Sequence, residues 1–282
     1  MFINYLSTPN LFDAFLHARY IIQNFAIQNF ISNPLTLNCK CYIIIYIICS
    51  HEIYVSAYLT NTNPFLSANA GIQPLNDFEL MDQLASSWAD ALLNSSSYGA
   101  AIHSYSSGWY TSLSDVEVLA RAIYCEGGTA YTNEEDAVAW VILNRVNNYA
   151  YSNAPIDIVK QANRFSSITG GASSTQYSRI PSTNTERWKH STYLACLLLT
   201  TTDTTKWKNI VGNPINGQLF FYSYTAAQSS SIFTGSNDAL KYNGKDINNV
   251  QVLGYGFVSS FSTLFQQYNP IRYSRNIFYS LK

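Results

Sequence analysis

Glu126 is an isolated carboxylate in an apolar setting, which makes it the first residue to consider for catalysis. It lies in the stretch ARAIYCEGGTAYTNEEDAVAWVILNRVNN, residues 120–148, and no other acid occurs between Ala120 and Glu134. A carboxyl group that is removed from water keeps its proton to a higher pH, because burial disfavours the charged form. A carboxylic acid that stays protonated near neutral pH can act as a general acid and protonate a leaving oxygen.

A helix that begins at Asp115 is expected to position Glu126. Ser114 followed three residues later by Glu117 is a capping-box signature, which marks a helix start. The apolar residues after it recur at helical spacing, at Val116, Leu119, Ala122 and Ile123. Glu126 continues this core-facing stripe in the last turn, where the negative end of the helix dipole adds to burial in raising the carboxyl pKa. The spacing alone is equally compatible with a local cap or ion pair.

The residues that follow end this helix and begin another. Gly127-Gly128 supplies the left-handed residue that closes a helix, and it leaves open backbone that a ligand could approach. Thr132 and Glu135 mark a second helix start. The expected buried face of this second helix consists of Ala137, Val138, Val141, Ile142 and Val146. The acids at 134–136 fall in its first turn, where they favour the helix dipole and are expected to stay solvated. Asn144-Arg145 closes the helix, either as a surface pair or reaching back toward the loop after the first helix.

The composition predicts a globular protein that does not bind nucleic acid. The 282 residues are 47% hydrophobic, which is enough for a core in one large domain or two ordinary ones. Only 12% are charged and the net charge is −1, so no basic field exists to attract DNA or RNA. Since there is no CxxC pair and no metal-ligand spacing among the four histidines, no metal site or cofactor is expected. The 22 tyrosines could stack on sugar rings, although most are expected to replace charges on a polar surface.

The first 110 residues are expected to form a separate helical docking or anchoring region. Residues 11–31 have apolar side chains at helical spacing, which predicts an amphipathic helix. The run CYIIIYIIC, residues 41–49, is too short to span a bilayer, which takes roughly 20 apolar residues. It suits a signal-peptide core or a buried strand, and a packing or docking element is favoured because forty residues precede it. A Ser-, Tyr- and Gly-rich stretch then places the domain boundary near Thr111, giving regions 1–110 and 111–282.

The two expected helices resemble the signature of the SleB-type cell wall hydrolases, the spore-cortex-lytic enzymes. The family pattern reads approximately A-R-A-I-Y-x-E-A-R-G-E and then, after a short gap, V-A-V-A-A-V-I-L-N-R-V. The chain matches it at residues 120–124, at Glu126, at residues 137–139 and at residues 141–146. The match is too long to be chance.

Later anchors of the family follow in the same order. KQANRFSSI, residues 160–168, is similar to the family's Q-P-x-Q-F-S segment, and GQLFFYSY, residues 217–224, is similar to its G-A-L-Y-Y-Y-N-P. The resemblance therefore spans about residues 114–282 and leaves the first 110 residues unexplained.

The resemblance implies a mainly α (α+β), lysozyme-like catalytic domain that cleaves the MurNAc–GlcNAc backbone of peptidoglycan. It maps the family glutamate onto Glu126, in agreement with the pKa argument made from the residues. No convincing second carboxylate is found, so the expected enzyme is a lytic transglycosylase in which Glu126 is both acid and base. Gln161 and Ser166 are candidate hydrogen-bond partners of the glycan strand. Phe165 and Tyr222 are candidate walls of its groove, although aromatics inside apolar runs are commonly core residues.

Three departures from the family pattern leave a second hypothesis open. The basic residue after the family glutamate is missing, since Gly127-Gly128-Thr129 stands there, and Asn276 replaces a histidine near the end. A Ser-, Thr- and Gly-rich insertion follows residue 168 and could cover the groove. The alternative is a non-catalytic glycan-binding or virion component, docked to a phage particle or cell envelope through residues 1–110. An acid on a core-facing stripe favours an enzyme, secreted or held in the cell envelope, because a structural domain would gain from an apolar residue there.

Overall fold

The computed structural model describes residues 42–48, 52–58, 76–128, 134–229, 231–235, 239–261, 264–265 and 274–282. The chain divides into two compact units, Met1–Leu75 and Asn76–Lys282. The predicted amphipathic helix at residues 11–31 lies outside the described residues. Within the described part of the chain, no helix is both long enough and apolar enough to cross a membrane.

The described part of the first unit is a β-hairpin. Strand β1 (Tyr42–Ile48) pairs antiparallel with β2 (Glu52–Tyr58), with Ile45 opposite Val55. β1 is the isoleucine-rich run of the sequence, and β-branched side chains favour extended backbone. The strand prediction for this run is met by β1, whereas the signal-peptide alternative stays a prediction.

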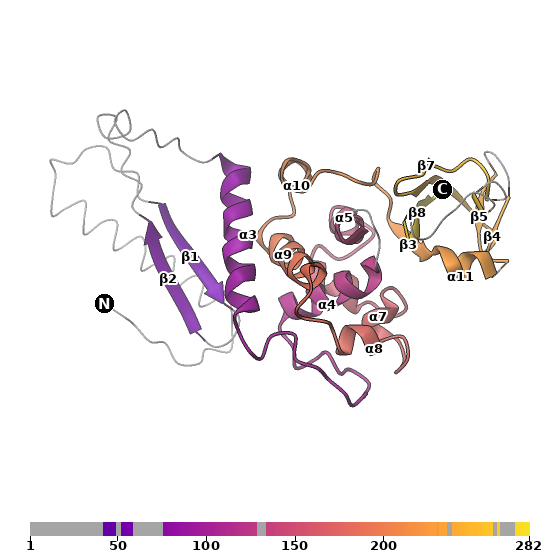
Figure 1. Cartoon of the computed structure of the whole chain (residues 1–282). Helices are drawn as coiled ribbons and strands as arrows, with labels where there is room; N and C mark the ends of the chain where they lie inside the picture. Colours follow the sequence, from indigo (N-terminus) through magenta and orange to yellow (C-terminus); the bar gives the residue numbers. More distant parts are fainter. Residues whose placement is uncertain are drawn as a thin grey trace, which may run out of the picture. The chain divides into compact units, whose positions relative to one another are not determined.

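The second unit begins with helices, among which α4 is central. They are α3 (Asp77–Leu93), α4 (Asp115–Gly127), α5 (Glu134–Val146), α6 (Pro155–Lys160), α7 (Ser166–Thr169), α8 (Gln176–Arg179), α9 (Glu186–Thr200) and α10 (Thr204–Ile210). α4 packs against α5, α6, α7, α8 and α9, and α3 lies beside α9 (Figure 1). Because α3 packs on α9, this unit begins at Asn76, upstream of the boundary expected near Thr111.

The C-terminal part of the second unit is an antiparallel sheet. Its strands are β3 (Phe220–Ser223), β4 (Phe233–Thr234), β5 (Lys241–Tyr242), β6 (Lys245–Val252), β7 (Gly256–Phe257) and β8 (Asn276–Leu281), and α11 (Tyr224–Ser229) follows β3. The strand order is β3-β8-β6-β5-β4, and β7 pairs with β6. β8, at the yellow end of the chain in Figure 1, therefore lies between β3 and β6. The described part of the unit is a mixed α and β fold with more residues in helices than in strands, which agrees with the expected mainly α (α+β) class.

Two clusters of buried side chains hold the second unit together. The first lies among the helices, and the four apolar residues predicted for the stripe of α4 are at most 2% exposed. The predicted face of α5 is also buried, except that Val146 is half-buried. The second cluster belongs to the sheet and is rich in aromatic rings, where Phe233 contacts Tyr242, Phe261 and Tyr279. Here the tyrosines help to fill a core, in contrast to the polar surface role expected for most of them.

Candidate active site

The end of α4 presents Glu126 to a cavity. Ser114 caps the start of this helix, because its side chain accepts a hydrogen bond from the amide of Glu117, as the sequence predicts. Glu126 lies in the last turn and is half-buried, facing a cavity of about 500 Å³. The cavity is also lined by basic side chains (Arg145, Arg164, Lys245 and Arg275) and by aromatic rings (Phe220, Phe221, Tyr222, Tyr242 and Tyr279).

The surroundings of Glu126 favour the protonated form of its carboxyl group. Burial raises the pKa of this group above its ordinary value. Hydrogen bonding to Ser167 and the positive charge of Arg275 lower the pKa, but they offset only part of the effect of burial. The Ser167 amide donates to Glu126 Oε1 at 3.1 Å. The shift has the direction that the sequence predicts and that a general acid needs.

A basic side chain lies beside Glu126 and comes from the far end of the chain. Gly128 has a φ of +66°, and a Cβ atom there would collide with the side chain of Arg275, so the glycine makes room for it. Arg275 Nη1 donates to the carbonyl oxygen of Cys125 at 3.4 Å, and Asn276 Nδ2 donates to the carbonyl oxygen of Glu126 at 2.9 Å. Arg275 is distant from Glu126 in the sequence but lies beside it in the structure. It therefore provides the basic group that the sequence lacks directly after Glu126.

Glu134 fixes the segment that carries Arg275 and Asn276. Its side chain is fully buried, contrary to the expectation that the acids of this turn stay solvated. Oε2 accepts from the Arg275 amide at 2.7 Å, and Oε1 accepts from the Asn276 amide at 2.6 Å and from Ser274 Oγ at 3.0 Å. Burial raises the pKa of Glu134 to about 7, although these hydrogen bonds act in the opposite direction. Glu134 thus anchors the start of β8 to α5.

The other two acids of this turn are also buried, and each binds a residue of α9. Glu135 is 7% exposed and its Oε1 accepts from Arg187 Nε at 2.6 Å, while Arg187 Nη2 donates to the carbonyl oxygen of Tyr124 at 2.7 Å. Asp136 is 5% exposed, and its Oδ1 lies 2.6 Å from His190 Nε2, a hydrogen bond that raises the pKa of the imidazole. These two acids join α5 to α9, and neither lines the cavity.

The raised pKa of Glu134 predicts that the free energy of unfolding falls as pH rises from about 4.5 to about 7. In this window the folded protein keeps a proton that the unfolded chain releases, so each pH unit costs at most about 1.4 kcal/mol. Glu134→Gln should lose this slope, as urea unfolding across the window will measure. Glu126 and His190, whose pKa values are also raised, remain in both proteins, so the difference isolates Glu134. Equal slopes would contradict the prediction.

The structure brings two of the four predicted glycan contacts to the cavity. Ser166 and Tyr222 line it together with Glu126. Phe165 does not, because its side chain is fully buried and lies edge to face against Phe221, with ring centroids 5.6 Å apart. Phe165 is therefore a core residue rather than a wall of a groove, which is the common fate of an aromatic side chain in an apolar segment.

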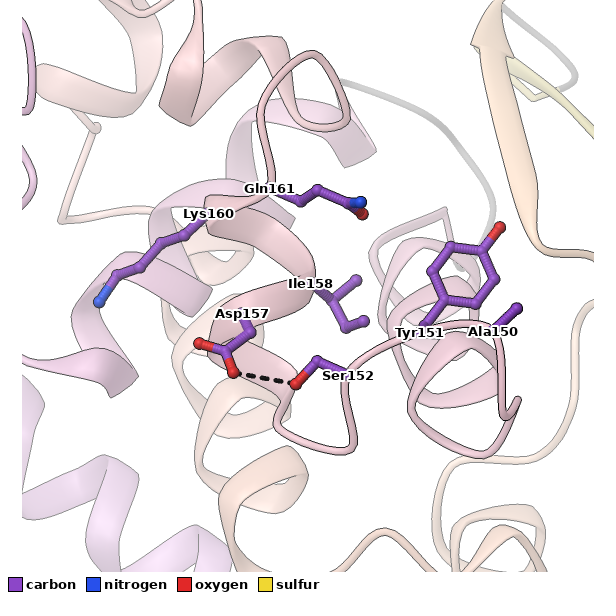
Figure 2. Close-up of a pocket in the computed structure, with 7 residues that line it drawn as sticks. All are labelled: Ala150, Tyr151, Ser152, Asp157, Ile158, Lys160 and Gln161. Carbon is purple, nitrogen blue, oxygen red and sulfur yellow. Dashed lines mark hydrogen bonds between the residues drawn. The ribbon is translucent and has the colours of Figure 1, made fainter.

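Gln161 lies at a separate hollow of about 390 Å³, beside α6. Figure 2 shows it there with Tyr151 and with Ser152, whose hydroxyl donates to Asp157 Oδ2 at 2.9 Å. Gln161 is the exposed C-terminal cap of α6 and does not line the cavity that holds Glu126. The structure therefore does not place it next to the acid.

The insertion after residue 168 leaves the cavity open. It contains α8 and packs against α4, where Arg121 Nη1 donates to the carbonyl oxygens of Ser178 at 2.7 Å and Arg179 at 3.1 Å. None of residues 167–184 lines the cavity. In the described ranges, no three side chains of His, Cys, Asp or Glu lie close enough together to hold a metal ion.

One protein family matches part of this chain. The profile of the family described as Cell Wall Hydrolase matches residues 132–246. This segment contains the cavity residues from Arg145 to Lys245, whereas Glu126 lies just upstream of it. No curated protein and no solved structure matches the chain, so the lysozyme-like fold stays a prediction.

Proposed function

We propose that this chain, whose residues 132–246 match the profile of the Cell Wall Hydrolase family, cleaves the glycan strands of peptidoglycan with Glu126 as its acid and base. The family supports the class of substrate, and the cavity supports the choice of residue. One observation carries the proposal: among the described residues, Glu126 is the one carboxylate that lines the cavity, and burial raises its pKa. The bond we assign to it joins MurNAc to GlcNAc.

A single carboxylate favours a lytic transglycosylase over a hydrolase with two carboxylates. In such a hydrolase the second group lies roughly 5–9.5 Å from the acid and acts as a nucleophile or activates a water molecule. Glu134 does not suit this role, because its carboxyl group is fully buried and accepts hydrogen bonds from the segment before β8. A transglycosylase needs no second carboxylate, since its nucleophile is an oxygen of the substrate.

The reaction that follows uses Glu126 twice. Its carboxylic acid protonates the glycosidic oxygen while the bond from that oxygen to C1 of MurNAc breaks. The carboxylate that remains then takes the proton of the C6 hydroxyl of the same MurNAc, and O6 bonds to C1 to close a 1,6-anhydro ring. Glu126 regains its proton and no water is consumed. The Ser167 amide, 3.1 Å from Glu126 Oε1, keeps the carboxyl group oriented for both transfers.

The same cavity offers contacts for the sugar rings. Tyr222 lines the cavity and supplies an aromatic ring of the kind that can stack on a sugar, and the hydroxyl of Ser166 can donate to a glycan oxygen. Such a substrate places the action of the protein in a cell envelope, whether it is secreted or carried by a phage particle.

The chemical form of the products tests this proposal. Purified peptidoglycan is digested with the wild-type protein and with Glu126→Gln, and the soluble fragments are analysed by mass spectrometry. We expect 1,6-anhydro-muropeptides from the wild type alone, each lighter by one water than the corresponding reducing sugar.

Other outcomes have distinct meanings. Reducing-end products would overturn the transglycosylase and indicate water as the nucleophile. Binding of several walls by both proteins without release of fragments would overturn the enzyme and indicate a glycan-binding protein.

A further inference from the structure

The cavity gathers four basic side chains, and among the described residues the only acid that lines it is Glu126, which lies beside Arg275. Within the described ranges, none of Arg145, Arg164, Lys245 and Arg275 forms an ion pair. Elsewhere in the same ranges, basic residues that pair with a carboxylate are Arg121, Lys160, Arg187, Lys189, Lys206 and Lys241. Arg179 and Lys208 also form no ion pair in these ranges, but neither lines the cavity, so the basic side chains without an ion pair that gather in one place are those around Glu126.

Arg145 shows that this is a built site rather than a set of surface charges. It is 3% exposed, and its Nε donates to the carbonyl oxygen of Leu219 at 2.7 Å. The rings of Tyr151, Phe165 and Phe220 surround the guanidinium at 5.4 to 5.6 Å. Nη1 is buried and has no hydrogen-bond partner among the described residues. Burial lowers the pKa of Arg145 to about 10, so the group stays charged at neutral pH and remains a donor without an acceptor.

Three exposed cations complete the arrangement around Arg145. Arg164 comes from the loop before α7, Lys245 begins β6, and Arg275 precedes β8. The guanidinium groups of Arg164 and Arg145 both lie near the ring of Phe220, at 6.0 and 5.4 Å from its centroid. Guanidinium groups bind carboxylates through two parallel hydrogen bonds, and a lysine adds a point charge.

We propose that this cavity recognises a carboxylate of peptidoglycan, with Arg145, Arg164, Lys245 and Arg275 as the anion subsite beside the catalytic acid. The inference rests on the proposed function and narrows its substrate to glycans that carry negative charge. The carboxylate has two sources, which are the lactyl group of an unsubstituted muramoyl residue and the peptide stem. A neutral polymer of GlcNAc has neither, so the cations select peptidoglycan over chitin.

Binding to the Glu126→Gln protein tests the proposal without cleavage. Calorimetry measures the binding of two carboxylate ligands, which are the GlcNAc–MurNAc disaccharide whose lactyl carboxylate is free and the same disaccharide carrying a stem dipeptide. The methylamide form of each disaccharide and chitotetraose are the neutral ligands for comparison. We expect at least one carboxylate form to bind about tenfold more tightly than its methylamide and than chitotetraose. The disaccharide that shows the preference identifies the source of the carboxylate.

Two lysines close together in the sequence provide a matched pair of variants. Lys245→Gln should reduce the preference for the carboxylate form about fivefold, because it removes one cation from the cavity. Lys241→Gln should leave the preference unchanged, because Lys241 lies outside the cavity and pairs with Asp246 at 3.6 Å. Arg164→Gln removes a second cation from the cavity, and because Arg164 is exposed this substitution should not impair folding.

The outcomes separate this inference from the proposed function. Equal binding of the acid and methylamide forms, identical behaviour of the two lysine variants, or no binding of any ligand would overturn the anion subsite. If the wild type nevertheless releases anhydro-muropeptides, the proposed function stands and only the anion subsite is overturned. A carboxylate preference that depends on Lys245, together with no cleavage of any wall, would support the subsite and overturn the catalytic proposal.

Discussion

Replacing Glu126 with glutamine is expected to lower the rate of peptidoglycan cleavage about a thousandfold, within the usual range for removal of a general acid. Glutamine keeps the shape of the side chain and an oxygen that can accept from the Ser167 amide, but it carries no proton to transfer. The folded protein should not suffer, because a neutral side chain avoids the cost of charging a carboxyl group whose pKa burial has raised. The decrease in turbidity of a wall suspension measures the rate, and the thermal midpoint measures folding.

The pH dependence provides a second signature of the same residue. Activity of the wild type should fall as pH rises through the pKa of Glu126, and this pKa lies above the ordinary 4.5 of a glutamate. Glu186→Gln is the matched control, because Glu186 is an exposed acid of α9 that pairs with Lys189 and does not line the cavity. A Glu126→Gln protein that keeps more than a tenth of the activity would show that another group is the acid.

The helix that carries the acid could be predicted because its signals are local. Ser114 caps α4 and the stripe behind it is buried, so helical spacing alone placed Glu126 in the last turn. The second hydrogen bond of a capping box, from the Ser114 amide to the Glu117 side chain, did not form. The Glu117 carboxylate instead accepts from Arg121 and from the amide of Gly99. A buried arginine nearby competes for the carboxylate, and no short pattern reveals that competition.

The sheet and half of the site escaped prediction because they depend on contacts between distant segments. Three strands, β4, β5 and β7, are two residues long, which is too short for an alternation of apolar and polar side chains to appear. The helix dipole predicts a solvated Glu134 in the first turn of α5, yet the segment before β8 covers this residue and brings Arg275 to Glu126. The missing basic group after Glu126 is the sequence feature that bears on Arg275, but by itself it favours a non-catalytic alternative and does not indicate a replacement from elsewhere in the chain.

Replacing Arg121 with methionine is expected to reduce the free energy of unfolding by about 3–5 kcal/mol, the usual cost of breaking a buried charged pair. The Arg121 side chain is fully buried, with Nη2 2.7 Å from Glu117 Oε1. It also donates to the carbonyl oxygens of Ala100, Ser178 and Arg179 at 2.7 to 3.1 Å. Methionine fills similar space, but it removes the charged partner of the buried Glu117 carboxylate and one donor from each of the three carbonyl groups. Urea unfolding measures the loss.

Two comparisons make the cause of this loss testable. Lys189→Met breaks only the exposed pair with Glu186, so its effect should stay within about 0.5 kcal/mol. Arg121→Met combined with Glu117→Met should be less destabilised than Arg121→Met alone, because no uncompensated charge remains buried. A double variant as unstable as the sum of the two single variants would contradict the coupling.

Replacing Arg121 should also change the position of the Glu126 carboxyl group, because contacts through the insertion connect the two residues. Arg121 holds the carbonyl oxygen of Ser178, the Ser178 hydroxyl donates to the carbonyl oxygen of Ser167, and the Ser167 amide donates to Glu126. If this chain of contacts positions the acid, Arg121→Met should lower the cleavage rate about tenfold at a temperature where the variant is still fully folded. Unchanged activity in the folded variant would show that Ser167 is held in place by α7 alone.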